Sequence, residues 1–339
     1  MTWAETLQQA YELFYKMLGG VWLVIQPDQE SEKFWLFLFS AFAVASGVYV
    51  WQHSKTRGVS FKKLLGFILP SSIYFHKSAI VDYKFYITSR ILGGFIYFET
   101  LIISAALMGG YYTSWLQHAF GPVESQLEAG LSARFSYTVI LVLAVDIGLY
   151  ISHYLQHKVP FFWEFHKVHH SAEVLTPITT YRFHPMDIIL DGVFTGLFGG
   201  IVTGIFGYLF YNGLDEITIL NTSVVMFAYN LTGHLRHSHI WLSYGWAPSH
   251  VFCSPAMHQI HHSNAERHID KNLGLVFSIW DYLAGTLYVP REQEDLTLGL
   301  RNQEHKEYAG VWTLYVLPVK KAARLVLSGI KYAQVRLGQ

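Results

Sequence analysis

The stretch HYLQHKVPFFWEFHKVHH, residues 153–170, holds five histidines in two spaced groups. His153 and His157 are four residues apart, and His166, His169 and His170 follow as an H-x-x-H-H box. On an α-helix, residues three or four positions apart share one face. Each group is therefore expected to direct its imidazole rings to one side of a helix.

A second H-x-x-H-H box follows later in the chain, at His258, His261 and His262. Imidazole is a borderline ligand that suits zinc, iron, copper and nickel. The two boxes, with the earlier pair, supply eight converging imidazoles, which is more than one tetrahedral ion uses. The spacing therefore predicts either two metal ions or one ion with a structural shell of histidines.

The composition is that of a membrane protein. Of 339 residues, 52% are hydrophobic and only 14% are charged. Soluble domains are typically about 25% charged. The net charge is zero with histidine neutral, so bulk charge gives no case for binding nucleic acid. The single cysteine, Cys253, excludes an intrachain disulfide framework and any four-cysteine zinc or iron–sulfur site.

Several apolar segments approach the length of about 20 residues that crosses a bilayer. They cover residues 34–51, 91–115, 135–152, 188–211 and 217–232, and the last two are joined by a short turn and are expected to form a helical hairpin. Residues 5–25 are either an interfacial helix or an extra span, and they lack the features of a signal peptide. We expect an all-α integral membrane protein with four to five transmembrane helices.

The distribution of basic residues predicts the orientation. Residues 53–90 contain seven lysines and arginines against one acid, Asp82, and are therefore expected to form a cytoplasmic loop. Counting spans from this loop puts every histidine box on the cytoplasmic side, at a membrane end. The histidines are thus expected to lie in a cytoplasmic helical cap that holds a dimetal site.

More candidate ligands follow the last apolar segment. His234 and His237 are favoured as ligands, and His239 is a weaker candidate. Asn230 lies one helical turn before His234 and either contacts a metal, directly or through water, or caps the helix. His184 either binds metal or holds the second nitrogen of a ligand.

An acid inside a predicted span is costly and often functional. Asp146 lies two helical turns before His153 on the same face. It either accepts the N–H of a ligating histidine or bonds to backbone or a neighbouring helix. The aromatic run at residues 161–165 either lines an entry for substrate or anchors the chain at the membrane interface.

The motifs HYLQH at 153–157, HKVHH at 166–170, RFHP at 182–185, HQIHH at 258–262 and WDYLAGT at 280–286 resemble the fatty acid hydroxylase/sterol desaturase superfamily of membrane non-haem di-iron enzymes. The resemblance covers about residues 135–290, which would form the catalytic domain. Residues 1–134 would form an N-terminal membrane region. Residues 291–339 would form a cytoplasmic tail whose basic amphipathic helix, from Pro318 onward, suits an anionic membrane face.

The resemblance implies two iron ions, with zinc possible in purified protein, together with O2. It also implies a separate electron donor, a b-type cytochrome or ferredoxin-like protein with its reductase, because the chain has no cysteine cluster or haem-domain pattern. The expected metal ligands are His153, His157, His166, His169, His170, His234, His237, His258, His261 and His262.

The expected reaction is hydroxylation, or desaturation, of an unactivated C–H bond in a lipid that enters from the bilayer. Sterols, fatty acyl chains, sphingoid bases, ether lipids and carotenoids all suit such a site. Three alternatives remain: a membrane haem cytochrome, a metal transporter, and a zinc protein without turnover. A haem site needs isolated histidines that face each other mid-span, and a transporter needs polar residues along several spans.

Overall fold

The computed structural model describes residues 29–53, 60–102, 105–123, 127, 129–210 and 214–337. Its α-helices are α2 (Gln29–His53), α3 (Phe61–Ile68), α4 (Ser71–Tyr74), α5 (Lys77–Ile102), α6 (Ala105–Phe120), α7 (Leu131–Lys158), α8 (Pro160–His170), α9 (Pro185–Leu209), α10 (Val224–Gly233), α11 (Pro255–His261), α12 (Ile279–Ala284) and α13 (Val311–Leu337). Short 3-10 helices are η1 (Pro177–Tyr181), η2 (Pro248–His250), η3 (Glu266–His268) and η4 (Arg301–Tyr308). The segment expected at residues 5–25 lies outside the described residues.

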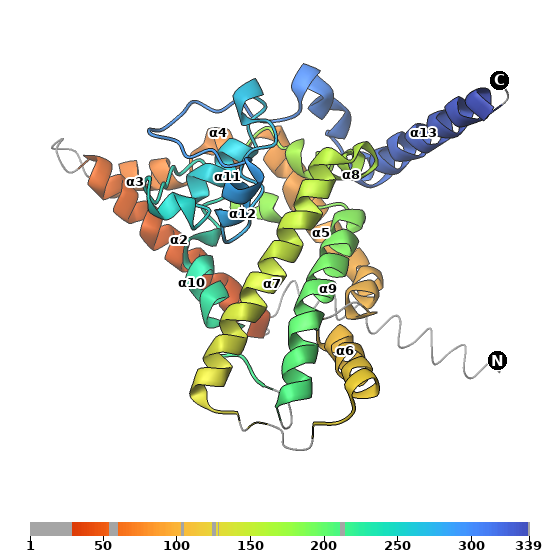
Figure 1. The fold of residues 1–339 in the computed structure, drawn as a ribbon. Helices are drawn as coiled ribbons and strands as arrows, with labels where there is room; N and C mark the ends of the chain where they lie inside the picture. The colour runs from red at the N-terminus through yellow and green to blue at the C-terminus, as the bar shows by residue number, and fades with distance from the viewer. Residues whose placement is uncertain are drawn as a thin grey trace, which may run out of the picture.

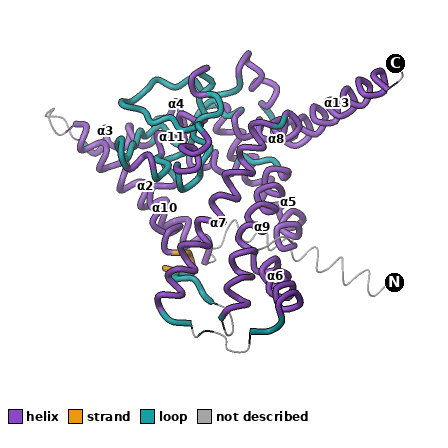
Figure 2. The backbone as a smooth tube through the Cα atoms, in the orientation of Figure 1, coloured by secondary structure: helices purple, strands orange, loops and turns teal. Residues whose placement is uncertain are grey.

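The helices divide into a long-helix layer and a cap. In Figure 1, α7 and α9 descend side by side from a region built of short helices, α6 lies beside the lower part of α9, and α13 leaves the upper region sideways. Figure 2 shows that loops make up much of the same region. We call α8, α11, α12 and the loops between them the cap.

The structure contains helices long and apolar enough to cross a membrane. They are Trp35–His53, Leu131–Lys158 and Pro185–Leu209. A fourth span arises if the bent pair Phe61–Tyr74 and Lys77–Leu92, which meet at 82°, is counted as one. The expectation of a mainly helical protein is confirmed, and the described residues hold three candidate spans, or four with the bent pair, where four to five were expected. The predicted segments 34–51 and 135–152 fall within α2 and α7, and the segment 188–211 overlaps α9.

Two predicted segments have the wrong boundaries. Residues 53–90, expected as a loop, contain α3, α4 and the start of α5. Lys62 and Lys63 lie on the exposed side of the amphipathic α3, whereas Ile68 is buried, so the basic residues mark one face of a helix. The predicted span at 91–115 is divided between α5 and α6.

The predicted helical hairpin is also wrong. Instead of a span at 217–232, the chain forms an antiparallel β-hairpin, Thr218–Ile219 (β1) with Thr222–Ser223 (β2), before α10. Leu220 and Asn221 make the turn with positive φ angles. Helix α10 has only 10 residues. A helix of this size is about 15 Å long, whereas the hydrocarbon layer is about 30 Å thick, so α10 is too short to span.

Glycines allow α9 to pack closely on its neighbours. A Cβ atom added at Gly200 would lie 2.4 Å from Cβ of Met108, and one at Gly204 would lie 2.4 Å from Cβ of Tyr112. Both neighbours belong to α6, so only glycine permits this approach. Such packing fixes the position of α9, whose first turn carries Asp187 toward the histidines.

Helix α7 links the long-helix layer to the cap. It begins at Leu131 and continues to Lys158, where Val159 adopts an extended conformation and Pro160 starts α8. Proline suits the first turn of a helix because that position needs no N–H donor. The sharp turn brings the histidines of α8 back against those at the end of α7.

Candidate metal centre

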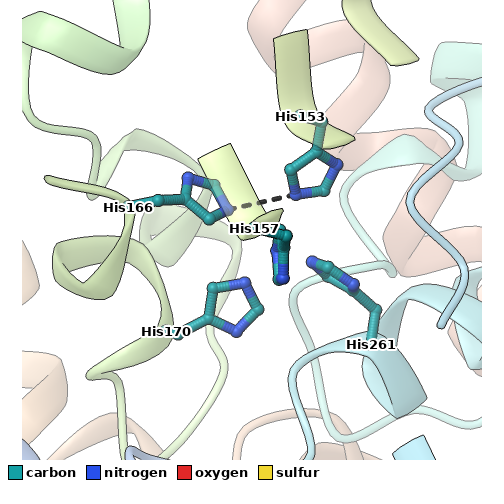
Figure 3. A group of neighbouring side chains, drawn as sticks. All are labelled: His153, His157, His166, His170 and His261. Carbon is teal, nitrogen blue, oxygen red and sulfur yellow. Dashed lines mark hydrogen bonds between the residues drawn. The ribbon is translucent and has the colours of Figure 1, made fainter. Parts of the chain in front are cut away.

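Nine of the predicted ligands come together in two buried or half-buried groups. One group holds His153, His157, His166, His170 and His261, and the other holds His169, His237, His258 and His262. Within each group the potential ligand atoms all lie within 4.8 Å of one another. Figure 3 shows the rings of the first group converging from α7, α8 and α11. Each group could hold a metal ion.

The two H-x-x-H-H boxes do not each serve one site. From the first box, His166 and His170 join the five-histidine group, whereas His169 joins the four-histidine group. From the second box, His261 joins the first group, whereas His258 and His262 join the second. Each box therefore contributes to both groups, which requires α8 and α11 to lie against each other.

The four-histidine group has the geometry of a coordination shell. Nε2 of His237 lies 3.2 Å from Nε2 of His169, 3.1 Å from that of His262 and 3.0 Å from that of His258. Four nitrogens at about 2.0–2.1 Å from one ion would be about 3.3 Å apart in a tetrahedron. A neutral ring carries one N–H, so His237 cannot satisfy three neighbours by hydrogen bonding. The donor set fits a metal ion.

The five-histidine group leaves buried nitrogens unsatisfied. Nε2 of His157, His170 and His261 has no hydrogen-bond partner among the described residues. Nε2 of His153 lies 3.1 Å from Nε2 of His166. Buried polar atoms are rarely left without a partner in native proteins, so these converging orphan nitrogens fit the ligand set of a metal ion. A metal ion would satisfy them.

Hydrogen-bond partners around the five-histidine group orient three of its rings so that Nε2 faces the centre of the group. Nδ1 of His153 donates to the Leu273 carbonyl over 2.7 Å, and Nδ1 of His261 donates to the Lys271 carbonyl over 2.9 Å. Nδ1 of His157 lies 3.3 Å from a carboxylate oxygen of Asp270. Because an N–H at Nδ1 leaves the lone pair at Nε2, these partners select the tautomer that binds metal.

The second group has different outer partners. Nδ1 of His237 lies 2.9 Å from the Thr180 hydroxyl oxygen. His258 is an exception among the ligands, since its Nδ1 accepts a hydrogen bond of 2.9 Å from the Arg236 guanidinium. The Arg236 side chain thereby fixes the orientation of the His258 ring.

Burial keeps the histidine rings neutral. Desolvation holds the pKa of His169, His258 and His262 well below the usual range, and the neighbouring rings lower it further. The same causes lower the pKa of His170 and His261. Neutral imidazole is the form that binds metal, so the rings other than His258 can bind ions at neutral pH. His258 differs, because the Arg236 guanidinium can only donate, so the proton of the neutral His258 ring is on Nε2 and must be released before that atom binds an ion.

A buried ion pair supports the end of α8, and the sequence analysis did not identify it. Arg182 of the RFHP motif pairs with Asp82, and both side chains are almost completely buried. The Arg182 guanidinium also donates to the Val168 carbonyl over 2.9 Å and to the Ser171 hydroxyl over 2.8 Å. It therefore holds the backbone that carries His169 and His170.

The WDYLAGT motif positions the loop behind His153. The buried carboxylate of Asp281 accepts hydrogen bonds of 2.8 Å from the backbone N–H groups of Leu273 and Gly274. Leu273 is the residue whose carbonyl contacts the His153 ring. The motif thus acts on His153 through the loop. Composition alone did not indicate a role for the motif, whereas its resemblance to the family did.

Asp146 does not contact a histidine ring. Its carboxylate accepts hydrogen bonds from the backbone N–H groups of Val276 and Phe277, at 3.0 and 3.1 Å, and from the Trp280 indole at 2.9 Å. Of the two interpretations of Asp146, the structure therefore favours bonding to backbone and a neighbouring helix. Its contacts tie α7 to the cap.

The other candidate residues lie outside the two groups. His184 caps α9: Nδ1 accepts from the Met186 N–H and Nε2 contacts the Tyr315 carbonyl, so both ring nitrogens are engaged. Nε2 of His239 contacts the Phe67 carbonyl at 2.6 Å. His234 and Asn230 border a cavity beside the groups and belong to neither.

Two cavities reach the histidines from different sides. The larger, about 560 Å³, is bordered by His153, His166, His169, His237 and His258. Its walls include Phe37 of α2, Leu149 of α7 and Asp191 of α9, so all three candidate spans contribute to it. The smaller, about 310 Å³, is bordered by the remaining four, His157, His170, His261 and His262.

Comparison with known proteins identifies the region that carries the histidines. Residues 138–286 match the model of the fatty acid hydroxylase family. The chain is 29% identical over 174 residues to an ornithine lipid hydroxylase of Rhizobium tropici, covering 51% of this chain and 48% of that protein.

Two further relatives match with lower identity. An alkylglycerol monooxygenase of Caenorhabditis elegans is 28% identical over 179 residues, covering 50% of this chain and 32% of that protein. Human cholesterol 25-hydroxylase is 24% identical over 152 residues, covering 44% and 51%. The matches thus span about half or less of each relative, and no solved structure matches the chain. Together the matched residues and these relatives place the histidine-rich region, residues 138–286, in the fatty acid hydroxylase superfamily.

Proposed function

We propose that this chain is an O2-dependent membrane oxidoreductase that hydroxylates, or desaturates, an unactivated C–H bond of a lipid at a di-iron centre. The observation that carries the proposal is the pair of histidine groups beside a cavity walled by all three candidate spans. The named relatives are lipid hydroxylases and monooxygenases, which supports lipid hydroxylation.

In this proposal the nine grouped histidines hold two iron ions. When bound, the ions supply the reduction of O2 and the removal of hydrogen from carbon. The protein's part is to orient the ligand rings through Leu273, Lys271 and Asp270, and to hold the lipid.

The larger cavity is the proposed binding site for the lipid chain. Apolar side chains of Phe37, Leu149 and Met226 line it together with the histidines. Its volume of about 560 Å³ is in the range of small-molecule sites. A lipid that enters between the spans would exclude water from the reacting carbon.

The electron donor is proposed to bind on the side of the protein where the smaller cavity opens. The chain would use a separate b-type cytochrome or ferredoxin-like donor with its reductase. The cavity reaches His157, His170 and His261 away from the lipid site, and Asn264 and Arg301 supply polar groups at its wall. The metal centre and this face would lie in the cytoplasm, as the basic residues between 53 and 90 indicate.

The geometry disfavours a haem cytochrome. Two axial histidines need a porphyrin plane between them, whereas the Nε2 atoms here are 3.0–3.2 Å apart. That separation suits ligands of one small ion.

The direct test compares lipids from cells that express the wild-type chain or its His261→Ala variant, grown under ¹⁸O2. The proposal expects a lipid that has gained one ¹⁸O atom, or a lighter lipid that has lost two hydrogens, in wild-type cells alone. Equal lipid profiles in cells with the wild-type chain, the variant and no added protein would reject the proposal.

A further inference from the structure

Helix α13 carries an apolar stripe that the rest of the described protein leaves uncovered. The stripe consists of Trp312, Val316, Val319, Ala323, Val326 and Leu327, which are all exposed. Trp312 is 70% exposed and Leu327 is 60% exposed. Their spacing of three, four and seven residues places them on one face of the helix.

As far as Ala322, the opposite face of the same helix is packed against the protein. Leu314 is completely buried and belongs to a cluster with Phe85, Val168 and Tyr308. Lys321 pairs with Glu304 and Glu307. Up to Ala322 the stripe is therefore the outward face of a docked helix, whereas from Ala323 to Ser328 every residue is exposed and the helix projects from the protein.

Basic residues run beside the stripe. Lys320 and Arg324 are exposed and form no ion pair within the described residues. The 27 residues of α13 contain no aspartate or glutamate. An apolar face flanked by lysine and arginine is typical of helices that lie in a membrane interface.

The start of α13 lies beside the first turn of one candidate span, α9, and beside the middle of α5. The Tyr315 hydroxyl is 2.6 Å from the Ser89 hydroxyl in α5. The Tyr315 carbonyl contacts Nε2 of His184, the residue before the candidate span Pro185–Leu209. From there α13 extends away from the body of the protein (Figure 1). A helix that starts at the end of a span and extends sideways lies at the level of the lipid headgroups.

We infer that α13 docks on an anionic lipid surface, with the stripe inserted below the headgroups and Lys320 and Arg324 contacting them. The negative charge of lipid phosphate and carboxylate groups complements the charge of α13. This helix has five basic and no acidic residues. The inference does not depend on the reaction at the metal centre.

The test uses the full chain with an environment-sensitive fluorophore on a single introduced cysteine. Leu327→Cys places the label on the stripe, and Gln293→Cys places it on an exposed part of the chain outside α13. The native Cys253 is completely buried, so the label selects the new position. Each protein is put into nanodiscs of phosphatidylcholine, with or without phosphatidylserine, that contain lipid-borne quenchers.

We expect the Leu327 label to be quenched in nanodiscs with phosphatidylserine, and the Gln293 label to stay unquenched. Lys320→Gln and Arg324→Gln should each lower the ratio of quenched to unquenched label about fivefold. Lys306→Gln, an exposed basic residue outside α13, removes the same charge and should leave the ratio unchanged.

Two results would overturn the inference. Equal quenching at Leu327 with and without phosphatidylserine would mean that anionic lipid is not recognised. Absence of quenching would mean that the stripe faces something other than lipid, and energy transfer between labelled copies would identify that partner as a second chain.

Discussion

His170 and His262, the last residues of the two H-x-x-H-H boxes, lie face to face with ring centroids 4.8 Å apart and planes inclined by 30°. They belong to different histidine groups. Two ions held by these groups would therefore be close neighbours. The two groups would therefore form one dimetal centre. Loss of a ligand in one group should weaken metal binding by the other group as well.

Removal of a grouped histidine should abolish activity without preventing membrane insertion. His261→Ala deletes a ring of the five-histidine group, and we expect lipid product to fall more than about 100-fold and bound iron to decrease. His250→Ala is the matched control because that ring contacts the Trp246 carbonyl and belongs to neither group. Wild-type product from the His261 variant would remove this residue from the site.

The contact between Asp270 and His157 should contribute to metal affinity. Asp270→Ala removes the carboxylate that orients the His157 ring, and outer partners of this kind change metal affinity by about 10- to 100-fold. Lys158→Ala removes the exposed half of the Lys158–Asp270 pair. It should lower the free energy of metal binding by less than about 1 kcal/mol. Competition with a chelator measures both. Equal affinities in the two variants would contradict the assignment.

The interior of the site could be predicted only in part from the sequence. Spacing identified the histidines of α7, α8 and α11, because residues three or four apart share a helical face. Spacing could not divide the boxes, since it places His166, His169 and His170 on one broad side of the helix without showing which partner each ring meets. The packing of α11 against α8 decides which ring joins which group.

Tertiary contacts also explain the other differences. Asp146 lies on the expected face of α7, but the loop at Val276 and Phe277 occupies its carboxylate. His234 ends α10, and the turn that follows carries His237 rather than His234 into the group. Arg182 was not singled out because its partner, Asp82, is a hundred residues earlier in the chain.

Breaking the Asp82–Arg182 pair should destabilise the protein strongly. Asp82→Ala leaves a buried guanidinium unpaired, which typically costs about 3–5 kcal/mol. Thermal unfolding of the detergent-solubilised protein should show the loss. The pair of the exposed Arg267 with Glu294 provides a control, since solvent screens the charge of Arg267 and Arg267→Ala should change stability little. Similar losses in the two variants would show that Arg182 does not hold α8.

Stability of the metal-free protein should fall in acid. Burial lowers the pKa of His169, His258 and His262, whereas the unfolded chain keeps the ordinary value of about 6.5. The unfolded state therefore binds more protons below pH 6.5, so stability is complete above that pH and is lost as pH falls. Each such histidine contributes a slope of up to about 1.36 kcal/mol per pH unit.

The pH dependence is measured as the thermal midpoint of chelator-treated protein. It should be level from pH 8 to 7 and decline from pH 6.5 to 5, and the decline should be shallower in His258→Ala. A midpoint that does not change down to pH 5 would show that these rings are not buried in a neutral form.

The most direct test of the central claim is the stoichiometry of Fe(II) bound by the purified chain under anaerobic conditions. The account predicts two tightly bound ions per chain, one for each histidine group, and a reduced number in His258→Ala, which lacks a ring of the four-histidine group. A single ion per wild-type chain, or uptake that the substitution leaves unchanged, would contradict it.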